Sequence, residues 1–345
     1  MVDPCVSEHV WDALKQIAAD QSARHLADDF AADPDRFTTL HRRCGPLLFD
    51  FSRQRLDQDV LGHLCSLADA CDLGGWIQRL FAGDPVNHTE QRPALHWALR
   101  LPPGSDFSLP GIPVSRLIER ELERMQALSE PLRTGKWLGV GGKPITDVVN
   151  VGVGGSDVGP LMVGRSLTDS LVPTGHPLQV HFASTMDGSQ LAQLLHSLDP
   201  ERTLFVISSK SFTTVDTLSN AATARHWLEK HFGVSDQLLE RHFIGISAFP
   251  ERLSDWGIPS QNQLIIYEWV GGRYSIWSAI GFPVVLRLGM AGFYQLLAGA
   301  HAMDRHFCEE PWLSNLPVLM GLIGIWNVNF MDIQSLAVLP YDGRL

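Results

Sequence analysis

The stretch Asp147-Val148-Val149-Asn150-Val151-Gly152-Val153-Gly154-Gly155-Ser156-Asp157 decides the fold, because a β-branched run passes here directly into glycines. Such a run predicts a buried strand, and the glycines after it predict a tight turn into a helix. Further apolar runs follow at 179–183, 203–207, 243–246 and 264–267, with helical stretches at 188–198 and 217–231. Strands that alternate with helices predict the α/β class, in which a parallel sheet is flanked by helices on both faces.

The regions on either side of this alternation have the three- and four-residue apolar spacing of helices. Helices are therefore predicted before the sheet at 10–30, 56–81, 94–101 and 114–132, and after it at 284–305 and 317–330. The chain then finishes with Ser335-Leu336-Ala337-Val338-Leu339-Pro340-Tyr341-Asp342, which has the apolar pattern of one more strand. This pattern is typical of the first strand of a further domain.

The composition is that of an ordinary folded protein, with 45% hydrophobic and 19% charged residues in a chain of 345. Twenty-seven Lys and Arg face 38 Asp and Glu, which leaves a net charge of -11 without a basic cluster. This charge argues against nucleic acid as a partner. An anionic ligand would need a local site, such as a helix N-terminus with one or two cations.

Cysteine usage and the apolar segments indicate a location in the cytoplasm. The cysteines are scattered without C-x-x-C spacing, which argues against a disulfide framework and a thiolate zinc site. The N-terminal sequence MVDPCVSEHVWDALKQ has charges where a signal peptide needs its apolar core. The strictly apolar run 316–326 is too short to span a bilayer, so we expect no membrane segment. No H-E-x-x-H or similar cluster is present, so we expect no metal.

The glycine loop after the first strand fits none of three familiar motifs. A dinucleotide fingerprint would need glycine at Asp157, and a nucleophile elbow would need glycine at Val158. The Gly-Lys pairs at 135–136 and 142–143 are followed by Trp137 and Pro144, so a Walker A loop is excluded. What remains is a backbone loop at the carboxyl end of a parallel strand, where α/β sheets bind ligands. A tight βα turn without a ligand is the alternative.

The segment Ser208–Thr217 follows the strand at 203–207 and leads into a helix. Six of its ten side chains carry hydroxyls, and Lys210 adds a positive charge. Helix N-termini offer free N–H groups and the positive end of a dipole, so the segment favours a phosphate monoester dianion. A solvated helix cap is the alternative, although capping requires a single such residue.

The segment Glu268–Ser278 places two glycines directly before Arg273. A guanidinium is always charged and only donates hydrogen bonds, so Arg273 is suited to stabilising an oxyanion or an enediolate. An arginine paired to a surface carboxylate is the alternative. The polar segment Asn87–Arg100 indicates no chemistry by itself, and His96 is interpreted as a structural histidine.

Five segments in this order resemble the phosphoglucose isomerase family, also called the glucose-6-phosphate isomerase family. They are DFSRQRL at 50–56, NHTEQRPALHWALR at 87–100, VVNVGVGGSDVGP at 148–160, SKSFTTVDT at 209–217, and the segment around WVGGRYS at 268–281. The similarity runs over essentially the whole chain. Small departures occur at Pro93, at Thr185-Met186 and at Val215-Asp216.

The resemblance implies a division of the chain and a set of substrate contacts. It implies an N-terminal helical region at 1–115, a first sugar isomerase (SIS) domain at 116–290, and connecting helices with the first strand of a second SIS domain at 291–345. Gly155 and Ser156 would lie at the sugar, and Arg273 beside the enediolate. The residues around the phosphate would be Ser209, Lys210, Ser211, Thr213, Thr214 and Thr217.

The family implies an isomerase that interconverts glucose 6-phosphate and fructose 6-phosphate through a cis-enediol, in glycolysis and gluconeogenesis. It implies a homodimer without a metal or nucleotide cofactor. The family's segments for the base, the second histidine and the late lysine are not in this sequence. We therefore expect a chain truncated within the second SIS domain, without useful turnover of its own. A non-catalytic sugar-phosphate-binding module is the alternative, although no helix-turn-helix pattern precedes the domain.

Overall fold

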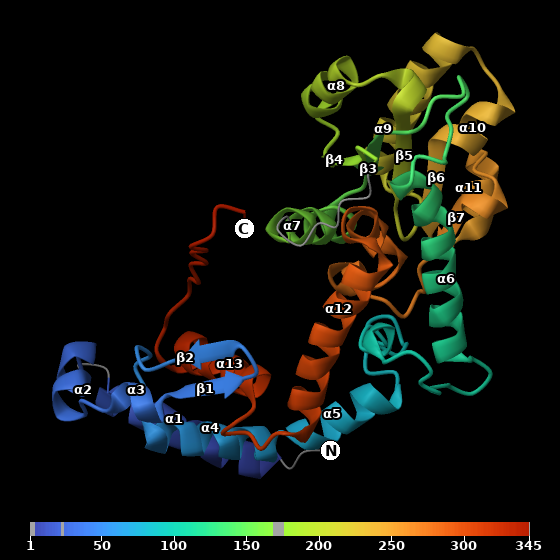
Figure 1. Cartoon of the computed structure of the whole chain (residues 1–345). Helices are drawn as coiled ribbons and strands as arrows, with labels where there is room; N and C mark the ends of the chain where they lie inside the picture. The colour runs from blue at the N-terminus through green and yellow to red at the C-terminus, as the bar shows by residue number, and fades with distance from the viewer. Residues whose placement is uncertain (1–3, 22–23, 168–175, 345) are drawn as a thin grey trace. The chain divides into compact units, whose positions relative to one another are not determined.

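The computed structural model describes residues 4–21, 24–167 and 176–344 of the chain, with side chains from residue 8 onward (Figure 1). Contacts divide the chain into two compact units. Unit 1 comprises Met1–Gln91 and Ala300–Leu339, and unit 2 comprises Arg92–Gly299 and Pro340–Leu345. The region at 116–290 lies within the range of unit 2, and its expected boundaries stay predictions. Each unit is described by itself.

Unit 2 contains a five-stranded sheet in which every neighbouring pair of strands is parallel, as predicted. The strand order is β4-β3-β5-β6-β7. The strands are β3 (Asp147–Val151), β4 (Gln179–Ala183), β5 (Thr203–Ser208), β6 (Phe243–Ser247) and β7 (Gln263–Ile265). The last strand ends before the predicted Tyr267, because the chain turns there and the Tyr267 carbonyl accepts a hydrogen bond from Val270 N at 3.0 Å.

Both faces of this sheet are buried. On one face, Val149, Phe205 and Ile207 join a hydrophobic cluster with side chains of the surrounding helices. These helices are α8 (Gly188–Ser197), α9 (Val215–Phe232), α10 (Asp236–His242) and α11 (Pro250–Trp256). Side chains alternate along a strand, so Val148 and Val206 point to the opposite face, and they are buried too. The predicted two-sided burial is therefore confirmed.

Helix α6 (Val114–Arg133) covers the outer edge of β7 with polar side chains. The Glu121 carboxylate accepts a hydrogen bond from Ile265 N at 2.8 Å, and Arg124 donates to the Gln263 carbonyl at 2.5 Å. Burial raises the pKa of Glu121. These contacts satisfy edge groups of β7 that would otherwise be open to another strand.

The strand order also locates the crevice of the sheet. Within this sheet, β3 comes first along the chain, and its neighbours β4 and β5 come second and third. In a sheet of this order, the topological switch lies between the first and third strands, and ligands bind beyond their carboxyl ends. The loops that follow β3 and β5 are the two loops that the sequence analysis selected.

Unit 1 is mainly helical, with α1 (Pro4–Gln21), α2 (Leu26–Ala32), α3 (Arg36–Thr39), α4 (Gln58–Ala70), α5 (Leu73–Ala82) and α13 (Leu316–Ile325). The single helices predicted at 10–30 and at 56–81 were wrong in extent, because each of these regions forms two consecutive helices. Asp72 ends the first helix of the second pair because it adopts φ +53° and caps α5, accepting a bond from Gly75 N. The hairpin of β1 (His41–Cys44) and β2 (Leu47–Asp50) was not predicted. In unit 2, the helix predicted at 94–101 is a single 3-10 turn at Ala98–Arg100.

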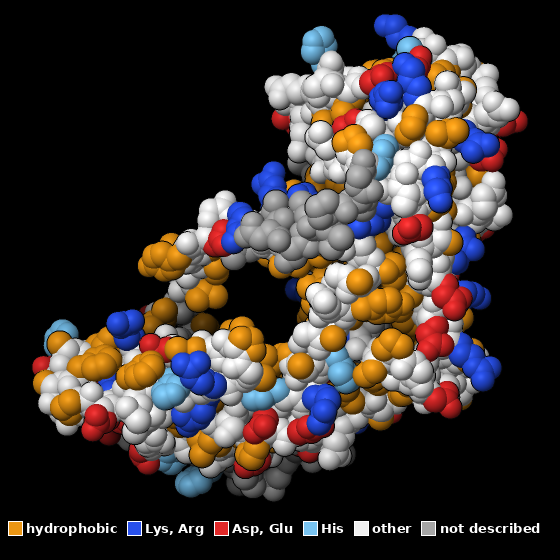
Figure 2. Space-filling view, viewed as in Figure 1, with side chains coloured by type: hydrophobic (Ala, Val, Ile, Leu, Met, Phe, Trp, Pro, Cys, Tyr) orange, Lys and Arg blue, Asp and Glu red, His pale blue; other side chains and the backbone are white. Residues whose placement is uncertain are grey.

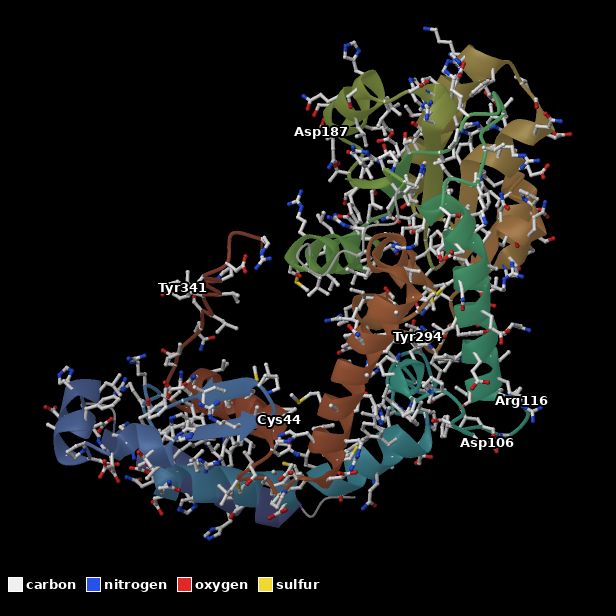
Figure 3. The ribbon with its side chains drawn as sticks, in the orientation of Figure 1. Cys44, Asp106, Arg116, Asp187, Tyr294 and Tyr341 are labelled. Atoms are coloured by element: carbon white, nitrogen blue, oxygen red, sulfur yellow. The ribbon has the colours of Figure 1, made fainter. Side chains whose placement is uncertain are left out.

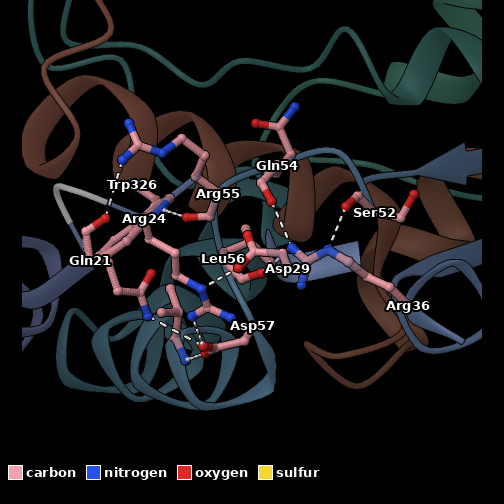
Figure 4. Close-up of polar contacts among 11 residues, drawn as sticks. Gln21, Arg24, Asp29, Arg36, Ser52, Gln54, Arg55, Leu56, Asp57 and Trp326 are labelled. Atoms are coloured by element: carbon pink, nitrogen blue, oxygen red, sulfur yellow. Dashed lines mark hydrogen bonds and ion pairs between the residues drawn. The ribbon is translucent and has the colours of Figure 1, made fainter. Parts of the chain in front are cut away.

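The segment after the hairpin is held by buried donors within unit 1 (Figure 4). The Arg36 guanidinium is 2% exposed and donates to the carbonyls of Ser52 at 2.7 Å, Gln54 at 2.8 Å, and Leu56. The Trp326 indole donates to the Arg55 carbonyl at 2.8 Å. Backbone groups of an irregular segment need partners when they are buried, and these donors supply them.

The strand predicted at 335–342 was wrong, because this segment is irregular and pairs with no strand among the described residues. A strand needs a neighbouring ladder for its backbone groups. Leu336 is 90% exposed and Val338 is 78% exposed. Figure 2 shows hydrophobic side chains along this segment, and Tyr341, labelled in Figure 3, is fully exposed.

Helix α12 (Phe282–Glu309) is broken at Gly289, which adopts φ +72°. It belongs to the one stretch of the described residues, Ala279–Glu309, that is long and apolar enough to cross a membrane. This stretch is longer than the strictly apolar run at 316–326. Of the most apolar 18-residue segment of this stretch, 56% is buried inside the structure, as in the core helix of a folded domain. Length and composition alone therefore do not assign it to a membrane.

Candidate active site

The loop after β3 makes close backbone approaches that only glycine allows. A Cβ atom at Gly152 would lie 2.9 Å from the Ser208 carbonyl oxygen, and one at Gly155 would lie 1.9 Å from the Gly272 carbonyl oxygen. Gly155 and Ser156 are both half-buried, in a short 3-10 turn. The glycines therefore do more than turn the chain, since they bring this loop against both other loops of the site.

In the loop after β5, hydroxyl groups form hydrogen bonds within the loop itself. Ser209 is buried, its hydroxyl accepts a bond from Phe212 N at 3.1 Å, and it lies 3.3 Å from the Thr214 hydroxyl. The Thr213 hydroxyl donates to that of Ser211 at 2.9 Å. Phe212 adopts φ +51°, which turns the chain sharply between them.

Helix α9 begins at Val215 directly after this loop. Thr214 occupies its N-cap position without a side-chain capping bond, so capping does not account for the hydroxyls. In the first turn, the Thr217 hydroxyl is buried and has no hydrogen-bond partner among the described residues. A buried hydroxyl of this kind is costly unless a ligand or water satisfies it.

Lys210 links the hydroxyl-rich loop to the loop that carries Arg273. Its ammonium donates to the carbonyl oxygens of Glu268 at 2.8 Å and Val270 at 2.7 Å. Its own carbonyl accepts a bond from Ala248 N at 2.9 Å. The positive charge of Lys210 is thereby fixed between the two loops.

Arg273 lies in a 3-10 helix, Gly272–Trp277, and its side chain is exposed. No carboxylate of the described residues pairs with it, so the alternative of a surface ion pair is not observed. The Ser275 hydroxyl donates to the Gly272 carbonyl at 2.7 Å and reaches the Gly155 carbonyl at 3.4 Å. The Arg273 loop thus packs directly on the glycine loop.

The segment at 87–100, which sequence analysis treated as uninformative, supports the Arg273 loop. Leu95 N donates to the Trp269 carbonyl at 3.1 Å. The His96 ring stacks on Tyr274 with 4.3 Å between ring centroids, and the Arg100 guanidinium lies 5.3 Å from the Trp277 ring. A local pattern does not reveal such contacts, because the partners lie far apart in the sequence.

Asp157, at the end of the glycine loop, is a further buried ionisable group. Its side chain is 6% exposed, and its Oδ1 has no hydrogen-bond partner among the described residues. Burial raises its pKa, while a hydrogen bond with Ser184 and the charge of Arg165 act in the opposite direction. From the sequence, Asp157 was interpreted only as a residue that argues against pyrophosphate binding.

The site therefore joins three loops of unit 2, with hydroxyls and Lys210 on one side and glycine backbone with Arg273 on the other. Donors of this kind can hold a phosphate dianion and stabilise an oxyanion nearby. The described residues contain no group of three or more His, Cys, Asp and Glu side chains that could hold a metal ion.

Comparison with known proteins identifies the family. The family model described as phosphoglucose isomerase matches residues 50–345. This chain belongs to the phosphoglucose isomerase family. It is 54% identical over 338 residues to a glucose-6-phosphate isomerase of Acinetobacter venetianus, which covers 98% of this chain and 60% of that relative. It is 51% identical over 342 residues to "glucose-6-phosphate isomerase 2" of Chromohalobacter salexigens, covering 97% and 61%.

A solved member of the phosphoglucose isomerase family has the same fold. It is the crystal structure of a glucose-6-phosphate isomerase from Chlamydia trachomatis, with a TM-score of 0.81 and 24% identity, covering 93% of this chain and 60% of that one. At this identity the likeness concerns the fold alone. This chain spans about 60% of the length of the family members it matches.

Proposed function

We propose that this chain forms the sugar-phosphate-binding part of an isomerase that interconverts glucose 6-phosphate and fructose 6-phosphate. One observation carries the proposal: the hydroxyl-rich loop after β5 is joined through Lys210 to the loop of Arg273, beside the glycine loop after β3. The loops after β3 and β5 lie at the switch point of the sheet, where α/β folds bind ligands. The names of the relatives supply the substrate class.

In this proposal the phosphate binds at the start of α9. The dipole and free N–H groups of the helix attract the dianion, and the hydroxyls add neutral donors. Lys210 adds a positive charge at the rim of this loop. The unpartnered Thr217 hydroxyl is a further donor for the phosphate. The donors are Ser209, Lys210, Ser211, Thr213, Thr214 and Thr217.

The sugar lies toward Gly155 and Ser156, with Arg273 beside the enediolate. Isomerisation moves a proton from C2 to C1 of the open-chain sugar, and the oxygens of the intermediate carry the developing negative charge. Arg273 stabilises that charge through an always-protonated guanidinium. The group that takes the C2 proton must be a positioned base, and the family's base segment is outside these 345 residues.

The wider role follows from the same assignment. We propose that the whole enzyme acts in glycolysis and gluconeogenesis, in the cytoplasm, as a homodimer without a metal or nucleotide cofactor. Its small-molecule partner is a hexose 6-phosphate, with neither nucleic acid nor a membrane involved. The region at 116–290 is the first SIS domain in this proposal, preceded by the helical region at 1–115, and residues 291–345 lead into the second.

The proposal is tested by titrating the chain calorimetrically with glucose 6-phosphate and with glucose. Lys210→Ala should weaken glucose 6-phosphate binding by about tenfold and leave the weaker glucose binding nearly unchanged, because it removes a charge-assisted contact. Lys230→Ala is the matched control, since Lys230 is exposed in the last turn of α9. Equal losses for both ligands would show that the loop does not recognise phosphate.

A further inference from the structure

Asn150 is a polar side chain near the carboxyl end of β3, between Val149 and Val151 along the strand. The residues paired with it on the neighbouring strands, Phe182 and Val206, are apolar. Asn150 is 0% exposed, and its neighbours Val149 and Val151 belong to the hydrophobic core. A strand buried on both faces is normally apolar throughout. A buried amide costs free energy unless its donors and acceptor are hydrogen-bonded, so its partners indicate why it is tolerated.

The two ends of the Asn150 amide contact two different loops of the site. Its Nδ2 donates to the Ser156 carbonyl at 3.0 Å, and its Oδ1 accepts a bond from the Ser208 hydroxyl at 2.7 Å. Ser156 lies in the loop after β3, and Ser208 is the last residue of β5. The amide therefore bridges the switch point of the sheet.

Each contact fixes a group next to the proposed ligand. Holding the Ser156 carbonyl sets the orientation of the Ser156–Asp157 peptide, directly after the two residues that lie at the sugar in the proposed function. Holding the Ser208 hydroxyl fixes the residue directly before Ser209, whose own N–H bonds to the Ile246 carbonyl at 3.0 Å. A valine at position 150 would keep the strand but would leave both partners unsatisfied.

We propose that Asn150 is a positioning residue that couples the sugar-side loop to the phosphate-side loop, so that hexose 6-phosphate is bound by both loops as one unit. Asn150 does not touch the ligand in this arrangement. The inference rests on the proposed function and adds to it a specific source of selectivity. The coupled loops recognise the whole hexose 6-phosphate better than inorganic phosphate.

The test compares the affinities of glucose 6-phosphate and inorganic phosphate, measured by calorimetry on the 345-residue chain. Asn150→Asp keeps the size of the side chain and its acceptor for Ser208, but it replaces the donor to the Ser156 carbonyl. We expect this variant to lose about tenfold in the preference for glucose 6-phosphate, with inorganic phosphate binding unchanged within about twofold. Asn262→Asp is the matched control.

Asn262 provides this control because it is also a buried asparagine of unit 2 that donates to backbone carbonyls. Its Nδ2 bonds to Glu240 O at 2.7 Å and Phe243 O at 2.8 Å, at the opposite end of the sheet. Asn262→Asp should lower the melting temperature while keeping the preference for glucose 6-phosphate. If Asn150→Asp does not fold, Ser208→Ala breaks the other half of the bridge and should lower the same preference.

Three outcomes overturn the inference. The first is an equal loss of both ligands in the Asn150 and Ser208 variants, which would indicate simple destabilisation of the loops. The second is an unchanged preference in a folded Asn150→Asp chain, which would leave the proposed function intact. The third is a wild-type chain that binds glucose 6-phosphate no better than inorganic phosphate, which would overturn the proposed function as well.

Discussion

The segment after the hairpin in unit 1 and the loops at the switch point in unit 2 use the same device with different results. In both, side chains donate to backbone carbonyls of an irregular segment. The buried Arg36 bonds to those of Ser52, Gln54 and Leu56. The buried Asn150 and the half-buried Lys210 bond to those of the site loops. The three hydrogen-bond acceptors of the Arg36 guanidinium are all backbone carbonyls of unit 1. The site loops additionally present the Thr217 hydroxyl and Arg273, for which no described residue supplies a partner.

A stabilising contact differs from a binding site in the polar groups that it leaves unpaired. A segment whose polar groups are all paired contributes to stability and has nothing left to offer a ligand. A segment that is held as firmly but has unpaired hydrogen-bond donors can bind an anion with little further loss of conformational entropy, because folding has already ordered it. The following predictions test this contrast.

The largest expected effect concerns turnover. The site loops should bind and polarise the substrate, but the family's base segment is not found among these 345 residues, and general acid–base catalysis contributes about 10²–10⁴-fold. We expect the 345-residue chain to form no fructose 6-phosphate above background in a coupled assay, and a chain extended through the second SIS domain to be active. Robust turnover that survives repurification and is lost on Arg273→Ala would contradict this expectation.

The second effect concerns stability in unit 1. Arg36→Met removes the donors to three buried carbonyls, and leaving such groups unsatisfied costs about 1–3 kcal/mol each. We expect a loss of about 3 kcal/mol or more in the free energy of unfolding of unit 1, measured by urea denaturation. Arg53→Met is the control, since Arg53 is exposed in the same segment. Unchanged stability of Arg36→Met would contradict the structural role of Arg36. A folded Arg36→Met chain that binds glucose 6-phosphate more weakly would show that Arg36 also supports the binding site.

The third effect is the reverse case in unit 2. Thr217→Val replaces a buried hydroxyl without a described partner by a methyl group of similar size. Stability should therefore hold or rise slightly, whereas glucose 6-phosphate affinity should fall by about tenfold, or ~1.4 kcal/mol. Thr223→Val serves as a control on the same helix, because its hydroxyl bonds to the Ser219 carbonyl on an exposed face. A large loss of stability with unchanged affinity would place Thr217 among the structural groups.

The smallest effect is a pH dependence at the amino end of the sheet. His242 is fully buried; its Nε2 accepts a bond from Val140 N at 3.0 Å, so its Nδ1–H donates to the Thr203 carbonyl at 2.6 Å. Burial lowers the pKa of His242 from its usual 6.5. The unfolded chain binds this proton more readily, so the stabilisation is present above pH 6.5 and is lost as the pH falls toward the lowered pKa.

One proton can contribute at most about 1.4 kcal/mol per pH unit to this slope. Urea denaturation between pH 7.5 and 5.5 should therefore show a decline that is shallower in His242→Asn, while His226→Asn, an exposed change on α9, should keep the full slope. Identical slopes in all chains would exclude His242 as the source.

The parallel sheet could be predicted from sequence because burial on both faces produces short apolar runs that local reading detects. The hairpin at 41–50 could not, since His41-Arg42-Arg43-Cys44 is mostly charged and polar. Asp72 also went unnoticed, because the apolar spacing of helices continues across it while its backbone turns left-handed. Apolar periodicity therefore locates buried elements better than it locates their ends.

The hydroxyls of Ser208–Thr217 could be recognised in the sequence because they are concentrated in one segment, and their role in holding a ligand stays a prediction. The contacts that assemble it join distant positions: Lys210 with Val270, Asn150 with Ser208, and His96 with Tyr274. Each depends on strand order and on the packing of loops against one another. A single sequence contains no local signal for such contacts.

The cover of α6 over β7 has a consequence for assembly. With the Ile265 N–H bonded to Glu121 and the Gln263 carbonyl bonded to Arg124, β7 does not offer these two groups to another strand. A fibre that grew by strand addition at β7 would first have to break these contacts with the helix.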